Sequence, residues 1–140
     1  MKIFDSMAIS GSALTAEKLR LDTISNNLAN INTTRTPQGG PYRRQVPVFA
    51  ENLEKAGSSK GENLSGVKVQ GIVHDPTPPK LVYEPDHPDA NDDGYVEMPN
   101  IDMVKEMVDM ITATRSYEAN VTSLNAAKNM FLKALEIGRG

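Results

Sequence analysis

The hydrophobic pattern is helical at both ends of the chain. In the first part, apolar residues repeat every seven positions with a second row interleaved: Leu14, Leu21, Leu28, Ile24 and Ile31. Such a heptad pattern predicts an amphipathic helix over residues 5–30, with Asp5 or Ser6 as its N-cap. Asn26, Asn27 and Asn30 lie beside these rows. Because Asn is a poor helix former, carboxamides at these positions favour a helix that hydrogen-bonds to other helices along its contact.

A second and longer helix is predicted over residues 100–137, with Asn100 as its N-cap. It carries two apolar rows that follow 3-4 spacing and are offset around the helix. The first row is Ile101, Val104, Val108 and Ile111, and the second is Tyr117, Val121, Leu124, Phe131 and Leu135. At 1.5 Å per residue the helix would be roughly 55 Å long, which exceeds the diameter of a small domain.

Between the helices, residues 32–99 contain all nine prolines. Alternating apolar residues predict short strands at 42–49, 66–73, 80–83 and 94–96, and the polar run 51–65 predicts a loop. The expected fold is α+β, in which long terminal helices pair as a coiled coil around a small β-rich, Pro/Gly-rich insert. The corresponding segments are 1–31, 32–99 and 100–140.

This insert is too small and polar to cover both helices, so the pattern predicts assembly with other subunits. Long helices obtain most of their stability from burying an apolar face. The residues expected at subunit contacts are the apolar rows and their neighbouring amides: Leu14, Leu21, Ile24, Asn26, Asn27, Leu28, Asn30, Ile31, Val108, Ile111, Tyr117, Asn120, Val121, Leu124, Asn125, Phe131 and Leu135.

Candidate chemistry is sparse. The run from Asp89 to Gly94 begins like a calcium-binding loop, but the twelfth position is Asn100 where a bidentate Glu is needed. His74 and His87 are the only histidines, and no activated nucleophile or phosphate loop is present. We therefore expect no enzymatic activity, no cofactor and no bound metal.

Composition narrows the partners further. A net charge of −3 argues against nucleic acid, which requires a clustered basic face. No segment reaches the ~20 apolar residues of a membrane span, so membrane insertion is not expected. Residues 84–109 carry nine acidic side chains and one basic one. They form either a solvated face or a contact with Arg35, Arg43 and Arg44 of a neighbouring subunit.

Three stretches resemble a known family. The run Ile24-Ser25-Asn26-Asn27-Leu28-Ala29-Asn30 is similar to the N-terminal signature of flagellar axial proteins, which form the rod, hook and hook-associated segments of the bacterial flagellum. Two further runs, Val82–Asn91 with Gly94-Tyr95-Val96 and Ala113–Asn120, resemble the proximal-rod protein C family of the basal body.

This resemblance implies a structural subunit of the flagellar rod, which assembles through its terminal helices into a helical tube that transmits torque across the periplasm. It implies export through the flagellar channel without a cleaved signal peptide. The implied partners are copies of the chain itself, the other proximal and distal rod proteins, the base adaptor of the rod, and the export apparatus. Two alternatives stay open from the residues: an export chaperone or adaptor, and a calcium-dependent binding module.

Overall fold

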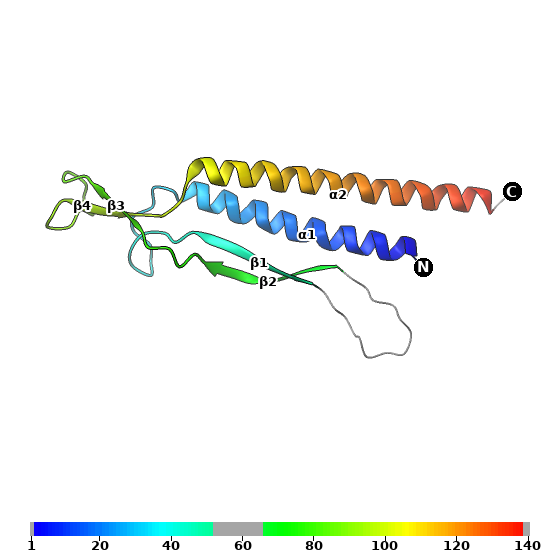
Figure 1. Ribbon diagram of the computed structural model, residues 1–140, viewed down its shortest axis with the longest axis horizontal. Coiled ribbons are helices and arrows are strands. Elements are labelled where there is room, and N and C mark those ends of the chain that lie inside the picture. Colours follow the sequence, from blue (N-terminus) through cyan, green and yellow to red (C-terminus); the bar gives the residue numbers. More distant parts are fainter. Residues whose placement is uncertain (1, 52–65, 139–140) are drawn as a thin grey trace.

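The computed structural model describes residues 2–51 and 66–138, and the side chains from residue 4 onward. The elements follow one another as α1 (Lys2–Ala29), β1 (Gln45–Glu51), β2 (Val67–His74), β3 (Lys80–Tyr83), β4 (Tyr95–Met98) and α2 (Met103–Ile137) (Figure 1). The α+β class is confirmed, as are a helix toward each end and the four short strands between them. Most of the predicted loop at 51–65 lies outside the described residues.

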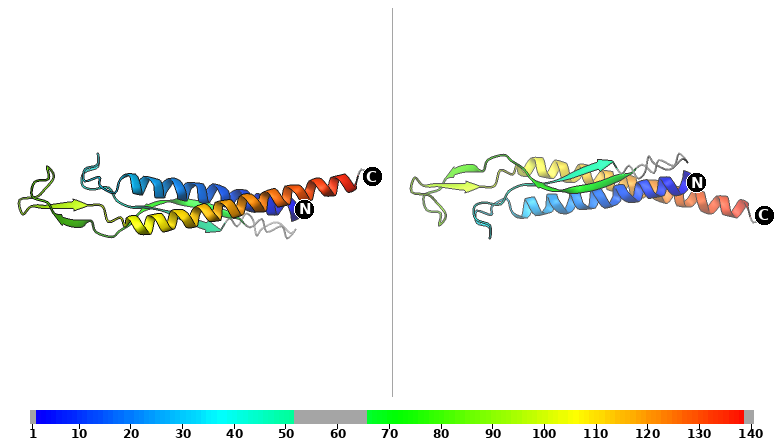
Figure 2. Two further views of the ribbon diagram at one scale, coloured as in Figure 1. Left: turned by 90° about the horizontal axis from the view of Figure 1, so that it is seen from above. Right: turned by 90° about the horizontal axis from the view of Figure 1, so that it is seen from below.

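Helix α1 lies at the centre of the molecule. It packs along α2, which runs in the opposite direction, and its other side contacts strands β1 and β2 (Figure 1). Helix α2 has no comparable contact with either strand. It also continues past the beginning of α1 (Figure 2). One side of α2 is therefore packed on α1, and the opposite side is not covered by another element of the described chain.

The strands form two separate antiparallel hairpins. In the first, β1 pairs with β2 and the register shifts between Val48 and Phe49, as in a β-bulge. In the second, β3 pairs with β4 and Tyr83 faces Tyr95 with their ring centroids 5.3 Å apart. This second hairpin forms the end of the molecule opposite the two chain termini (Figure 1).

Both predicted N-caps are wrong. Helix α1 is already formed at Lys2, so Asp5 and Ser6 lie inside its first turns. Helix α2 is capped by Asp102, whose carboxylate accepts a hydrogen bond from the Val104 amide at 2.9 Å. Asn100 precedes the helix because the backbone between Pro99 and Ile101 forms a tight turn first.

The core is thin. Among the described residues, the fully buried apolar side chains are few and mostly small: Ala16, Ile24, Val96, Ile101, Ala113 and Ala127. Alanines on facing helices let the two backbones approach closely. Four polar side chains are buried as well: Ser10, Thr23, Asn27 and Glu106. The contact between the helices therefore depends on polar groups as well as apolar ones.

Candidate subunit-assembly site

Asn27 joins helix α1 to the beginning of strand β1. Its side chain is 1% exposed. The carboxamide nitrogen donates to the Gln45 carbonyl at 2.9 Å, and the carboxamide oxygen accepts from the Gln45 amide at 2.9 Å. The side chain thus pairs with both backbone groups of one β1 residue, as a residue of a neighbouring strand would. All of its hydrogen-bonding groups are used, since Tyr42 and Glu106 occupy the remaining positions.

Glu106 brings helix α2 into the same junction. Its carboxylate is fully buried and accepts from the Asn27 nitrogen at 3.1 Å and from the Arg44 Nε at 2.6 Å. The Arg44 guanidinium also lies 3.5 Å from Asp75 and 3.7 Å from Asp109. Burying a carboxylate is costly unless it is paired and hydrogen-bonded, and here both conditions are met.

We call Asn27, Tyr42, Arg44, Gln45 and Glu106 the polar junction. Three parts of the chain meet in it: α1, α2, and the segment leading into β1. The pKa of the Tyr42 phenol is raised above its ordinary value of 10. The main cause is burial, and the negative charge of Glu106 adds to it. Tyr42 is therefore neutral at physiological pH and donates its hydroxyl proton to Asn27 at 3.2 Å.

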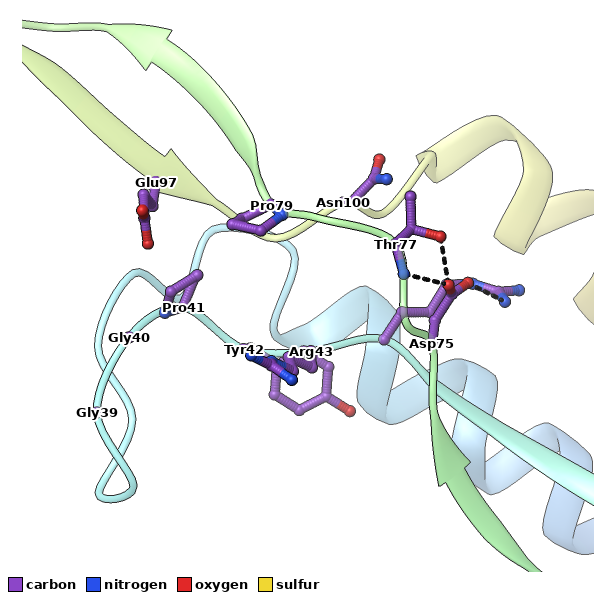
Figure 3. Close-up of a pocket in the computed structure, with 11 residues that line it drawn as sticks. Gly39, Gly40, Pro41, Tyr42, Arg43, Asp75, Thr77, Pro79, Glu97 and Asn100 are labelled. Carbon is purple, nitrogen blue, oxygen red and sulfur yellow. Dashed lines mark hydrogen bonds and ion pairs between the residues drawn. The ribbon is translucent and has the colours of Figure 1, made fainter.

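A small cavity of about 140 Å³ adjoins the polar junction (Figure 3). It is lined by the Gly39–Arg44 segment, by Asp75, Thr77 and Pro79, and by Glu97 and Asn100. Hydrogen bonds from the Thr77 hydroxyl and amide lower the pKa of Asp75. The lining holds no cluster of carboxylates or histidines arranged for a metal ion, and none was found in the described part of the chain.

Part of the acidic segment 84–109 is paired within the chain. The sequence predicted either a solvated face or an intersubunit contact for it. Arg35 pairs with Asp89, and Thr34 donates to the same carboxylate at 2.7 Å. Asp89, the first residue of the run that resembled a calcium loop, therefore holds the loop after α1 against the hairpin. Arg44 likewise pairs with Glu106 of its own chain. Of the three arginines considered, only Arg43 has no ion pair among the described residues.

The outward side of α2 is apolar over its first turns. Five large apolar side chains, each more than half exposed, follow one another along one helix face: Met103, Val104, Met107, Val108 and Ile111. We call this set the outer face. Val108 and Ile111, which the sequence predicted at subunit contacts, are 56% and 54% exposed. Adjacent apolar side chains this exposed are typical of interaction surfaces.

The second apolar row of α2 lies on the other side of the helix. Ala113 and Ala127 are buried there, and Tyr117, Leu124 and Phe131 are half-buried. The Phe131 ring meets Phe4 of α1 edge-on, with centroids 5.3 Å apart. The second row therefore packs on α1 as far as Phe131, whereas Val104, Val108 and Ile111 of the first row are left uncovered.

The residues predicted at subunit contacts fall into three groups. Ile24 and Asn27 are buried within their own chain. Ten are half-buried, mostly along the two helices: Leu14, Leu21, Leu28, Asn30, Ile31, Tyr117, Asn120, Val121, Leu124 and Phe131. Five are exposed: Asn26, Val108, Ile111, Asn125 and Leu135.

Sequence reasoning missed most of the polar junction. Glu106 was treated as one charge of an acidic face, and Tyr42 and Gln45 were not singled out. A signal was available for Glu106, because it lies seven residues before Ala113 on the buried side of α2. For Gln45 no side-chain pattern exists, since Asn27 recognises its backbone.

Comparison with known proteins agrees with this architecture. A family model described as flagella basal body rod protein matches residues 7–35, and one described as flagellar basal body rod FlgEFG protein C-terminal matches residues 92–137. These two matches cover α1 and α2 and define the class as flagellar rod proteins.

Curated relatives are similar over the full chain. Flagellar basal-body rod protein FlgC of Bacillus subtilis is 48% identical over 99% of this chain and 100% of its own length. The FlgC proteins of Borreliella burgdorferi and Escherichia coli O157:H7 are 47% and 46% identical, covering 100% and 99% of this chain and 100% and 98% of their own.

The chain belongs to the flagellar basal-body rod protein FlgC family. It is a structural component of the flagellar basal body and not an enzyme, which confirms the resemblance seen in the sequence. Neither the chaperone nor the calcium-module alternative is supported by these relatives. Among the described residues, no helix is sufficiently long and apolar to cross a bilayer.

Proposed function

We propose that this subunit builds the wall of the rod by packing the outer face of α2 against neighbouring rod subunits. In this arrangement α1 and α2 act as one coiled-coil unit lining the inner wall of a helical tube, and the hairpins face outward. A contact between unlike surfaces of successive subunits, which does not close into a ring, generates such a tube.

The outer face is the single observation that supports this proposal most directly. Its five apolar side chains lie opposite the row that packs on α1. A helix with apolar residues on two sides needs a partner on each side, and α1 covers only one side of α2. Three other exposed residues were predicted at subunit contacts: Asn26, Asn125 and Leu135. We propose that they lie at the margins of the same contacts.

The coiled-coil part of the proposal has separate support. Along α2 the residues turned toward α1 recur with alternating spacings of four and three: Ala113, Tyr117, Asn120, Leu124, Ala127 and Phe131. This is the spacing of a heptad seam. On α1 the buried positions are Ser10, Ala16, Thr23, Ile24 and Asn27. Most of them are small or polar, and the predicted leucines of α1 are only half-buried.

Torque is then carried by many parallel helix contacts along the tube. The partners we propose are copies of this chain, the adjoining rod proteins and the base adaptor, reached after passage through the flagellar export apparatus. The polar junction serves this role indirectly, because it holds α2 in a fixed position relative to β1 and so orients the outer face.

The test is the double substitution Val108→Asp, Ile111→Asp in a strain lacking its own copy of the gene. Both side chains are more than half exposed, so the monomer should keep its helical circular dichroism and melting temperature. Placing two carboxylates in an apolar contact is strongly unfavourable, and we expect at least about tenfold less protein in isolated basal bodies.

Ser123→Asp is the matched control. It adds a carboxylate to the same helix at an exposed position outside the outer face. The control should incorporate and support swimming as the wild type does. Normal incorporation of the double variant would overturn the role assigned to the outer face.

A further inference from the structure

The β3–β4 hairpin presents an apolar face that its own chain covers only in part. Tyr95 and Glu97 border a cavity shared with Gly40 and Pro41, whereas Leu81 and Tyr83 are left exposed. Leu81 and Tyr83 alternate along β3 and pair with Glu97 and Tyr95 of β4, so these four side chains share one side of the hairpin. Leu81 is 64% and Tyr83 is 62% exposed, whereas Val96 on the other side is 1% exposed. A two-stranded sheet is marginally stable in water, and one with a bare apolar face gains from a partner.

Negative charge lies beside this face, so a partner surface should carry a positive charge. The loop between β3 and β4 contributes four carboxylates that have no ion pair within the described chain: Glu84, Asp86, Asp92 and Asp93. Asp89 is the exception, since it pairs with Arg35. The hairpin face is therefore complementary to a surface that combines apolar groups with a free cation.

One such surface lies on the chain itself, in the Gly39–Arg43 segment. Arg43 is exposed and has no ion pair among the described residues, while Arg35 and Arg44 are both paired. Pro41 and Tyr42 lie next to it and line the cavity beside the polar junction (Figure 3). This segment lies toward the same end of the molecule as the hairpin (Figure 1).

We propose that the β3–β4 face of one subunit docks on the Gly39–Arg43 segment of a second copy, with Arg43 pairing with Asp92 and Asp93. The inference rests on the proposed assembly into a tube. Copies placed side by side around a tube axis present the same end of the molecule at nearly the same height. The hairpin of one copy can therefore meet the segment of the next, and the contact is heterologous, as a helical assembly requires.

Charge reversal tests the pairing. Arg43→Glu, and separately Asp92→Lys with Asp93→Lys, should each lower incorporation into basal bodies about tenfold, because like charges then face each other. All three side chains are exposed and free of ion pairs within the described chain, so the monomer should fold normally. The chain carrying all three changes should recover incorporation to within about twofold of the wild type.

Either of two results overturns the proposal: single reversals that incorporate normally, or a combined variant that is no better than the single ones. The second result would point to a different rod protein as the partner. The Val108→Asp, Ile111→Asp variant, assayed in parallel, shows independently whether the proposed assembly through α2 fails.

Disulfide cross-linking measures the contact directly, because the sequence contains no cysteine. Two differently tagged chains, one carrying Arg43→Cys and the other Asp93→Cys, would be expressed together and their basal bodies oxidised. We expect a dimer that carries both tags and is absent when either cysteine is omitted. If both chains are incorporated and no mixed dimer forms, the contact is refuted.

Discussion

Replacing Asn27 with alanine should strongly destabilise the folded chain. The side chain makes four hydrogen bonds: one to the Gln45 carbonyl, one from the Gln45 amide, one to Glu106 and one from Tyr42. Alanine makes none of them. The Gln45 amide and carbonyl would lose their partners at the point where β1 begins, and Glu106 would retain only Arg44.

The size of the loss in unfolding free energy can be worked out from these hydrogen-bond partners. A typical hydrogen bond contributes about 1 kcal/mol net, and a buried group left without a partner costs about 1–3 kcal/mol. Water can reach the half-buried Gln45 and Tyr42 and recover part of the loss. We therefore expect the free energy of unfolding to fall by about 3 kcal/mol, a large part of the 5–15 kcal/mol of a typical domain.

Urea unfolding of the purified chain, followed by circular dichroism, measures this change, and hydrogen exchange at the Gln45 amide locates it. Asn26→Ala is the matched control, because Asn26 is the preceding residue, is exposed and makes no side-chain hydrogen bond among the described residues. We expect a change below about 0.5 kcal/mol for the control. A loss below 1 kcal/mol for Asn27→Ala would refute the importance assigned to the polar junction.

Two further predictions concern the alkaline limit and the second hairpin. The pKa of Tyr42 is higher in the folded chain than in the unfolded chain, so above pH 10 the unfolded chain releases a proton that the folded chain retains. The free energy of unfolding therefore keeps its full value below pH 10 and falls above it. Unfolding free energies measured from pH 8 to 11 should show this fall, and Tyr42→Phe should weaken it; an identical slope in both proteins would contradict the assignment. Gly94→Ala should destabilise the β3–β4 hairpin by about 1–2 kcal/mol, because Gly94 has φ of 79° and an added Cβ would lie 2.9 Å from the Tyr83 ring. Hydrogen exchange across Tyr95–Met98 reports this change, and unaltered protection there would count against it.

The periodic parts of the fold could be predicted from the sequence. The 3-4 spacing located both helices, and alternation located the strands, because these periods reflect which side of an element is buried. The offset between Ile111 and Tyr117 correctly indicated that α2 has two apolar sides. Which side packs within the chain could not be predicted, since that depends on whether α1 or another subunit covers it.

The hydrogen bonds of the polar junction could not be predicted from the sequence, for a different reason. The sequence predicts Asn27 at a subunit contact because a carboxamide on a helix needs a partner, whereas in the structure the side chain is buried within its own chain. Two of its four hydrogen bonds are to the backbone of Gln45, and a backbone partner leaves no trace in the side-chain pattern. The N-cap of α2 was missed by two residues, because Asn100 and Asp102 have similar capping propensity and only the turn at Ile101 selects between them.

The antiparallel contact between α1 and α2 also constrains the order of folding. Phe4 and Phe131 touch although more than a hundred residues separate them along the chain. Closing such a long loop has an entropic cost and slows folding, and the packing energy of the helix pair is gained only when both helices are present. A chain that emerges from a narrow passage beginning with α1 would have to wait for α2 before its longest contact could form. In such a passage the topology alone would keep the subunit from completing its fold until α2 had emerged.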